Sequence, residues 1–181
     1  YIKLINNQFQ NAGYDEAGAK KAADAIMKIE TALAKAHFPK EKTRIPELNY
    51  HKMKVSSLKD SVADFEWKEF FSAIGVKEFD ELNVSQIEPI AAAVNIIKTT
   101  PIEDSKAYLS WCVINTAANY LGDNFVNANF EFYGREMSGR KVLQPRWKRT
   151  VSTINGALGE EVGKMYVEKY FPPQAKERMV N

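Results

Sequence analysis

The side chains that most often bind metals or act as nucleophiles are scarce in this sequence. It contains two histidines, His37 and His51, and one cysteine, Cys112. The histidines lack the His-Glu-x-x-His spacing that places two imidazoles on one helical face around zinc. One cysteine can form neither an internal disulfide nor a cysteine-based zinc site. We therefore predict that this chain binds no metal, and we interpret both histidines as exposed loop residues.

The other candidates for catalysis favour structural interpretations. Cys112 follows Trp111 in a strongly helical pattern and has no histidine nearby in sequence, so we expect a buried structural thiol. Glu160 and Glu161 are adjacent and point about 100 degrees apart on a helix, so they cannot flank one bond as an acid and base pair. We expect both to be solvated. The sequence thus indicates no catalytic and no metal-binding residue, and its substrate-binding residues are unknown.

Glycine patterns give no sign of a nucleotide or nucleophile site. The Gly-x-Ser-x-Gly turn and the glycine-rich phosphate and dinucleotide loops do not occur in the sequence. The nearest pattern is Gly156, Gly159 and Gly163, which lie inside a predicted helix. Small residues at these spacings permit close helix packing, so we predict packing at these positions.

One segment, residues 135–149, is strongly basic. Glu136 is its only acid, Trp147 lies within it, and its cations are Arg135, Arg140, Lys141, Arg146, Lys148 and Arg149. A basic run with an aromatic residue could contact phosphate or nucleic acid. A solvated helix start, whose arginines tie a loop to neighbouring carboxylates, is the simpler interpretation. We therefore predict no nucleic-acid partner.

Length and composition are those of an ordinary folded domain. The 181 residues are 45% hydrophobic and 27% charged, which excludes disorder and low-complexity architectures and predicts a single domain over residues 1–181. The formal net charge of +2 does not indicate a nucleic-acid or membrane surface. No apolar run approaches the ~18 residues of a membrane span, so we predict no membrane contact by this segment.

Apolar periodicity predicts helices along most of the chain. The first covers residues 15–36, followed by a solvated connection over 37–54 and a short aromatic helix with Asp64 as N-cap and Gly75 at its end. Ser85 to Glu88 and Thr100 to Glu103 have the spacing of capping boxes and predict two further helix starts. Residues 81–84 are read as a short extended segment with no clear partner.

Two long helices are expected after the second capping box, over residues 102–132 and 145–171. We expect them to pack antiparallel because only a short polar connection joins them. The packing residues would be Trp111, Leu121, Phe125, Val151, Ile154 and Leu158. The predicted fold class is all-α, a multi-helix lobe with two long antiparallel helices and at most one or two very short strands.

Short motifs follow one another in a fixed order over about residues 15 to 180. They are Leu48-Asn49-Tyr50-His51-Lys52-Met53 with Leu58, Phe65-Glu66-Trp67 with Phe70-Phe71, Ala107-Tyr108-Leu109-Ser110-Trp111, Phe130-x-Phe132-Tyr133-Gly134 with Ser138-Gly139, Pro145-Arg146-Trp147-Lys148-Arg149, and Asn155-Gly156, Gly159, Gly163-Lys164, Tyr166-Val167-Glu168 and Phe171. In this order they resemble the neprilysin and endothelin-converting-enzyme family of zinc metallopeptidases. Thr150 stands where many members have cysteine, so a bacterial-type oligoendopeptidase fits better.

The resemblance implies a fragment of the helical N-terminal lobe of such a peptidase. In that family the zinc ligands lie in a His-Glu-x-x-His helix and a downstream glutamate, and this chain has neither. The implied role is a wall of an internal cavity that limits substrates to oligopeptides, in a secreted or cell-envelope metalloendopeptidase located in the periplasm, the envelope or outside the cell. The implied partners are the catalytic lobe of the same parent chain and its peptide substrates, with zinc bound only in the parent. We predict that this chain alone is inactive.

A second hypothesis from the residues is a free-standing helical binding module that uses the basic segment 135–149. The two hypotheses predict different behaviour in solution. An exposed lobe interface would give weak, salt-resistant self-association. A nucleic-acid module would give binding that weakens steeply as salt rises.

Overall fold

The computed structural model describes residues 1–63 and 65–180, so the predicted N-cap Asp64 lies outside the described residues. The described chain is helical apart from short connections and two three-residue strands, which confirms the predicted all-α class. It divides into two compact units, residues 1–132 and 133–181, and each is described by itself. That they form one domain stays a prediction.

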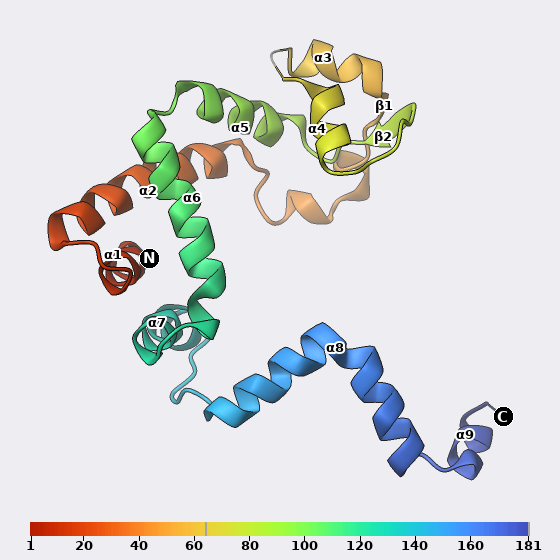
Figure 1. The fold of residues 1–181 in the computed structure, drawn as a ribbon. Coiled ribbons are helices and arrows are strands. Elements are labelled where there is room, and N and C mark those ends of the chain that lie inside the picture. The colour runs from red at the N-terminus through yellow and green to blue at the C-terminus, as the bar shows by residue number, and fades with distance from the viewer. Residues whose placement is uncertain (64, 181) are drawn as a thin grey trace. The chain divides into compact units, whose positions relative to one another are not determined.

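The first unit is built around three helices, α1 (Ile2–Asn11), α2 (Glu16–Ala36) and α6 (Ile102–Ala117) (Figure 1). The predicted helix over 15–36 is confirmed as α2, whose N-cap Asp15 accepts a hydrogen bond of 2.7 Å from the backbone N–H of Gly18. Helix α1 was not predicted, although its apolar residues also recur at helical spacing. Together these helices bury the core residues Leu4, Ile5, Phe9, Ala19, Ala22, Ala23, Ile26 and Trp111.

Helix α5 (Ile87–Thr99) packs on α2, and α6 follows it after a sharp corner. Neither helix has the predicted capping box, because no side chain caps their first turns. The side chain of Gln86 instead accepts a hydrogen bond of 2.8 Å from the backbone N–H of Phe38, and Glu103 binds the ammonium of Lys106 at 2.8 Å. Because Glu103 binds Lys106, it does not cap the start of α6.

The long helix predicted over residues 102–132 is wrong as a continuous element. Helix α6 ends at Ala117 and is followed by a 3-10 helix (Ala118–Tyr120), helix α7 (Asp123–Asn129) and a π-helix (Phe130–Glu136). The break lies at Leu121, whose backbone is extended, and at Gly122, which becomes the N-cap of α7. The carbonyl of Phe125 in α7 accepts a hydrogen bond of 3.0 Å from the buried side chain of Gln8, which ties α7 to α1.

A smaller cluster forms the other end of the first unit. Strand β1 (Lys52–Lys54) pairs antiparallel with β2 (Glu81–Asn83), with Met53 opposite Leu82; this confirms the short extended segment predicted over 81–84 and supplies the partner that the sequence did not show. Between the strands lie a 3-10 helix (Val55–Ser57), α3 (Leu58–Ser61) and α4 (Trp67–Ala73). Before β1, two 3-10 turns (Lys42–Arg44 and Pro46–Leu48) occupy the exposed connection. The buried residues of this cluster are Leu58, Val62, Trp67, Val84 and Val94.

The second unit contains α8 (Arg146–Tyr170) and α9 (Pro173–Val180). Helix α8 confirms the predicted helix over 145–171, although Leu158 has a non-helical backbone that kinks it. Helix α9, which begins at Pro173 directly after Pro172, was not predicted. No residue of α8 is buried, and Trp111 is buried within the first unit. The antiparallel packing of residues 102–132 on α8 stays a prediction.

Candidate functional site

The described residues hold no group of three or more His, Cys, Asp or Glu side chains that could bind a metal. His51 is a structural residue: its Nδ1 lies 3.0 Å from the carbonyl oxygen of Val84, and its backbone N–H donates to Asn83 Oδ1 at 2.7 Å. His37 is exposed at the end of α2. The two histidines therefore belong to separate parts of the first unit, and His51 supports its local structure.

Cys112 is exposed, so the prediction of a buried thiol is wrong. The reason is geometric, because Cys112 is turned about 100 degrees from Trp111 on α6 and leaves the face that packs on α1 and α2. Burial raises the pKa of Tyr108, one turn earlier, and the neighbouring Cys112 and Glu30 raise it further.

The predicted solvation of Glu160 and Glu161 is confirmed, and Glu161 binds the ammonium of Lys164 at 2.8 Å.

Helix α6 carries apolar side chains on two opposite faces. Its inner face buries Trp111, whose Nε1 donates to the Tyr1 hydroxyl at 3.0 Å. Its outer face, here called the α6 outer stripe, consists of Ile102, Leu109 and Val113, with Tyr120 in the adjoining 3-10 helix. These side chains are between 64% and 70% exposed. Steps of seven and four residues place Ile102, Leu109 and Val113 within about 20 degrees of one line on α6, opposite Trp111, and Tyr120 follows after the end of α6.

Sequence reasoning missed the α6 outer stripe because it followed only the apolar series through Trp111. The missing signal was a second series with the same period, from Ile102 through Leu109 and Val113. A soluble helix with one partner normally has one apolar face and one polar face. A helix that is apolar on two opposite faces is typical of an inner layer covered from both sides.

The start of α8 combines positive charge with exposed apolar surface. Arg146 and Lys148 are exposed, and the ammonium of Lys148 lies 5.4 Å from the centre of the Trp147 ring. Three cations in the first turn, counting Arg149, and no acid oppose the helix dipole, which favours negative charge at an N-terminus. Because this arrangement does not stabilise the helix, it indicates a surface suited to an anionic neighbour.

The rest of α8 is also exposed. Its apolar line includes Trp147, Val151, Ile154, Leu158 and Met165, all on the surface. No atom lies within 4 Å of a Cβ built on any of its three glycines, so the close packing predicted at these positions is not found among the described residues. Among the described residues, no helix combines the length and the apolar character needed to cross a membrane.

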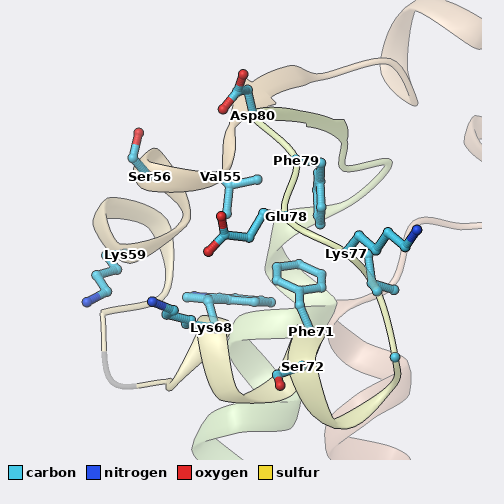
Figure 2. A pocket seen from close by; sticks show the side chains of 13 residues that line it. Val55, Ser56, Lys59, Lys68, Phe71, Ser72, Lys77, Glu78, Phe79 and Asp80 are labelled. Carbon is cyan, nitrogen blue, oxygen red and sulfur yellow. The ribbon is translucent and has the colours of Figure 1, made fainter.

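One pocket of about 1010 Å³ lies in the small cluster at the end of the first unit (Figure 2). It is lined by Trp67 and Phe71 of α4, by Val55, Ser56 and Lys59, and by the chain from Gly75 to Asp80. This pocket was not predicted, because its lining residues come from separate segments.

Comparison with known proteins gives consistent matches over the whole chain. The model for the N-terminal part of peptidase family M13 matches residues 1–181. Human endothelin-converting enzyme 1 is 29% identical over 168 residues, which cover 91% of this chain and 22% of that enzyme. The Mycobacterium tuberculosis zinc metalloprotease Zmp1 in its open state is 34% identical with a TM-score of 0.88, covering 99% of this chain and 28% of that chain. Its inhibitor complex gives 33% identity and a TM-score of 0.86. The chain thus spans only about a quarter of the length of these relatives.

Proposed function

Because this chain belongs to peptidase family M13, we propose that it is the helical, non-catalytic part of a zinc metalloendopeptidase that cleaves oligopeptides. The similar proteins include an endothelin-converting enzyme and a zinc metalloprotease, both much longer than this chain. The described residues do not form a metal site, so we assign the zinc and its chemistry to the rest of the parent protein. We propose that the isolated chain is inactive.

The observation that carries this proposal is the α6 outer stripe. Exposing these four large apolar side chains is unfavourable, since burial of apolar surface yields roughly 25 cal/mol per Å². The inner face of α6 is already covered by α1 and α2. A second layer is therefore needed, and we propose that the rest of the parent chain, including its catalytic lobe, provides it.

The cationic start of α8 supports the same proposal and specifies the partner's chemistry. Exposed Arg146 and Lys148, placed where the helix dipole is unfavourable, suit an acidic surface on the catalytic lobe. The apolar line of α8 continues from this start. In this account both units face the catalytic lobe and form part of the wall of an internal chamber that admits only oligopeptides. The parent enzyme acts in the periplasm, in the cell envelope or outside the cell. The partners are that lobe and the peptides.

The experiment compares the isolated chain with the full-length parent. We expect the pure chain to hold no stoichiometric zinc after dialysis and to cleave no peptide, whereas the parent does both. In the parent, Leu109→Asp combined with Val113→Asp should lower peptide cleavage at least tenfold by separating the lobes. Ile2→Asp, which changes another exposed apolar residue, should leave cleavage nearly unchanged. Chelator-sensitive cleavage by the isolated chain would contradict the proposal.

The alternative, a free-standing module that binds nucleic acid through residues 135–149, is favoured by exposed Trp147 beside its cations. Sedimentation of the chain with and without an oligonucleotide separates the two functions. Tight binding that falls steeply with salt would favour the module. Weak self-association that resists salt would favour an exposed lobe interface.

A further inference from the structure

The pocket of Figure 2 has a rigid aromatic surface. Trp67 is buried and donates its Nε1–H to the Val62 carbonyl at 3.3 Å. Its ring stacks on Phe71 at a centroid distance of 6.0 Å, and Phe71 meets Phe79 edge to face at 5.0 Å. Aromatic rings held in this way bind a large apolar side chain without much loss of conformational entropy.

One side of the pocket is cationic. The ammonium groups of Lys59 and Lys68 lie on the side away from Phe79, and both side chains are exposed (Figure 2). Neither lysine forms an ion pair with any described residue. The Glu78 carboxylate points into the pocket towards this side, also without an ion pair in the described chain. Both ammonium groups are therefore placed to attract an anionic ligand, which Glu78 opposes.

The chain from Lys77 to Phe79 offers backbone groups to such a ligand. Hydrogen bonds hold both ends of this stretch, from Val76 N–H to the Phe71 carbonyl and from Val55 N–H to the Asp80 carbonyl. Between them, the backbone groups of residues 77–79 make no hydrogen bond within residues 1–63 and 65–180. Strand β1 ends at Lys54, opposite Glu81, so among the described residues no strand pairs with the chain that precedes β2. Free backbone groups beside side-chain pockets are the features by which proteins bind extended peptides.

We propose that this pocket binds an extended peptide segment in which a bulky apolar residue is followed by acidic residues. The apolar side chain packs on Trp67, Phe71 and Phe79, and the acidic side chains reach Lys59 and Lys68. The backbone of residues 77–79 pairs with the peptide backbone. Glu78 weakens binding by repulsion and thereby restricts the pocket to peptides with more than one acid. The site requires no catalytic lobe, so the proposal is independent of the function proposed above.

Fluorescence anisotropy with the full 181-residue chain tests the ligand class. The probe is fluorescein-labelled Gly-Ser-Phe-Glu-Glu-Gly, compared with Gly-Ser-Phe-Lys-Lys-Gly and Gly-Ser-Ala-Glu-Glu-Gly. We expect saturable binding of the first peptide and binding at least tenfold weaker for the other two. Absence of saturable binding, or equal binding of all three peptides, would overturn the proposal.

Two variants with substitutions outside the buried core test whether the peptide binds in this pocket. Lys59→Gln combined with Lys68→Gln should weaken binding of the acidic probe about tenfold, and Glu78→Gln should strengthen it severalfold. The matched control is Lys28→Gln combined with Lys35→Gln, two exposed lysines of α2. Far-ultraviolet circular dichroism confirms that each variant is folded. Equal losses in the two lysine pairs, or weaker binding by Glu78→Gln, would overturn the site.

Discussion

Trp111 and Trp147 both belong to apolar lines on long helices, but their surroundings are opposite. Trp111 is 2% exposed within the core of α1, α2 and α6, whereas Trp147 on α8 is 63% exposed. Both helices show the same periodic pattern in the sequence. Apolar periodicity therefore identifies the apolar face of a helix, but it does not show whether the element that packs on that face lies in the same stretch of chain.

The largest expected effect comes from replacing each of these tryptophans by alanine in a separate variant. Trp111→Ala should lower the free energy of unfolding by about 3–5 kcal/mol, because it leaves a core cavity and removes the bond to Tyr1. Trp147→Ala should change it by no more than about 0.5 kcal/mol. Urea unfolding followed by circular dichroism measures both. Similar losses for the two variants would show that α8 is packed as tightly as α6.

Glycine substitutions compare the interior of α8 with the start of α2. Gly159→Ala should stabilise α8 by up to about 1 kcal/mol, since no atom lies within 4 Å of the new Cβ. In Gly18→Ala the new Cβ would lie 2.9 Å from Asp15 Oδ1 and would displace the N-cap, so no gain is expected. Amide hydrogen exchange resolves the two helices. Weaker protection of α8 in Gly159→Ala would indicate that this glycine is packed.

Charge reversal at the two helix starts should have smaller and opposite effects. Lys148→Glu places an acid in the first turn of α8 and should stabilise that helix by about 0.3–1 kcal/mol in the isolated chain. Glu16→Lys at the start of α2 should cost a similar amount. Hydrogen exchange of the first two turns measures both changes. A loss of protection in Lys148→Glu would show that the cations stabilise α8 by contacts within this chain.

The smallest effect concerns the pH dependence of the first unit. Burial raises the pKa of Tyr108 above its ordinary value, so folding favours the neutral phenol. The contribution of the neutral Tyr108 phenol to folding stability is complete below the pKa of the unfolded state. It is lost as pH rises through the raised pKa of the folded state. Tyr108→Phe should therefore reduce the fall in unfolding midpoint between about pH 9 and pH 11. Tyr166→Phe on exposed α8 is the control, and equal effects of the two variants would contradict this assignment.

Local signals predicted α2, α5 and α8 but missed α1 and α9, and they predicted the interruptions of helices poorly. Asp15 and Gly75 mark helix ends by local backbone chemistry, so those boundaries could be predicted. The break at Gly122 was missed because Leu121 and Phe125 keep helical spacing across it. The β1–β2 pair joins segments far apart in sequence, which periodicity cannot connect.

The candidate sites were harder to predict than the helices. The basic residues at the start of α8 were visible in the sequence, because Arg146, Lys148 and Arg149 lie within four positions of one another. The α6 outer stripe required counting two apolar series on one helix, and the exposure of Cys112 follows from the same geometry. The pocket depends on Lys59, Lys68 and Phe79, which only the folded chain brings together.

Thiol labelling of the α6 outer stripe tests the central claim most directly. Val113→Cys is introduced with Cys112→Ser, and the labelling rate is measured in the isolated chain and in the full-length parent with its other cysteines replaced by serine. Because Val113 is exposed in this chain and is covered in the parent by our account, labelling should be at least tenfold slower in the parent. Ile2→Cys, in the same background, should label at similar rates in both proteins. Equal rates for Val113→Cys in the two proteins would contradict the claim that the rest of the parent covers this face.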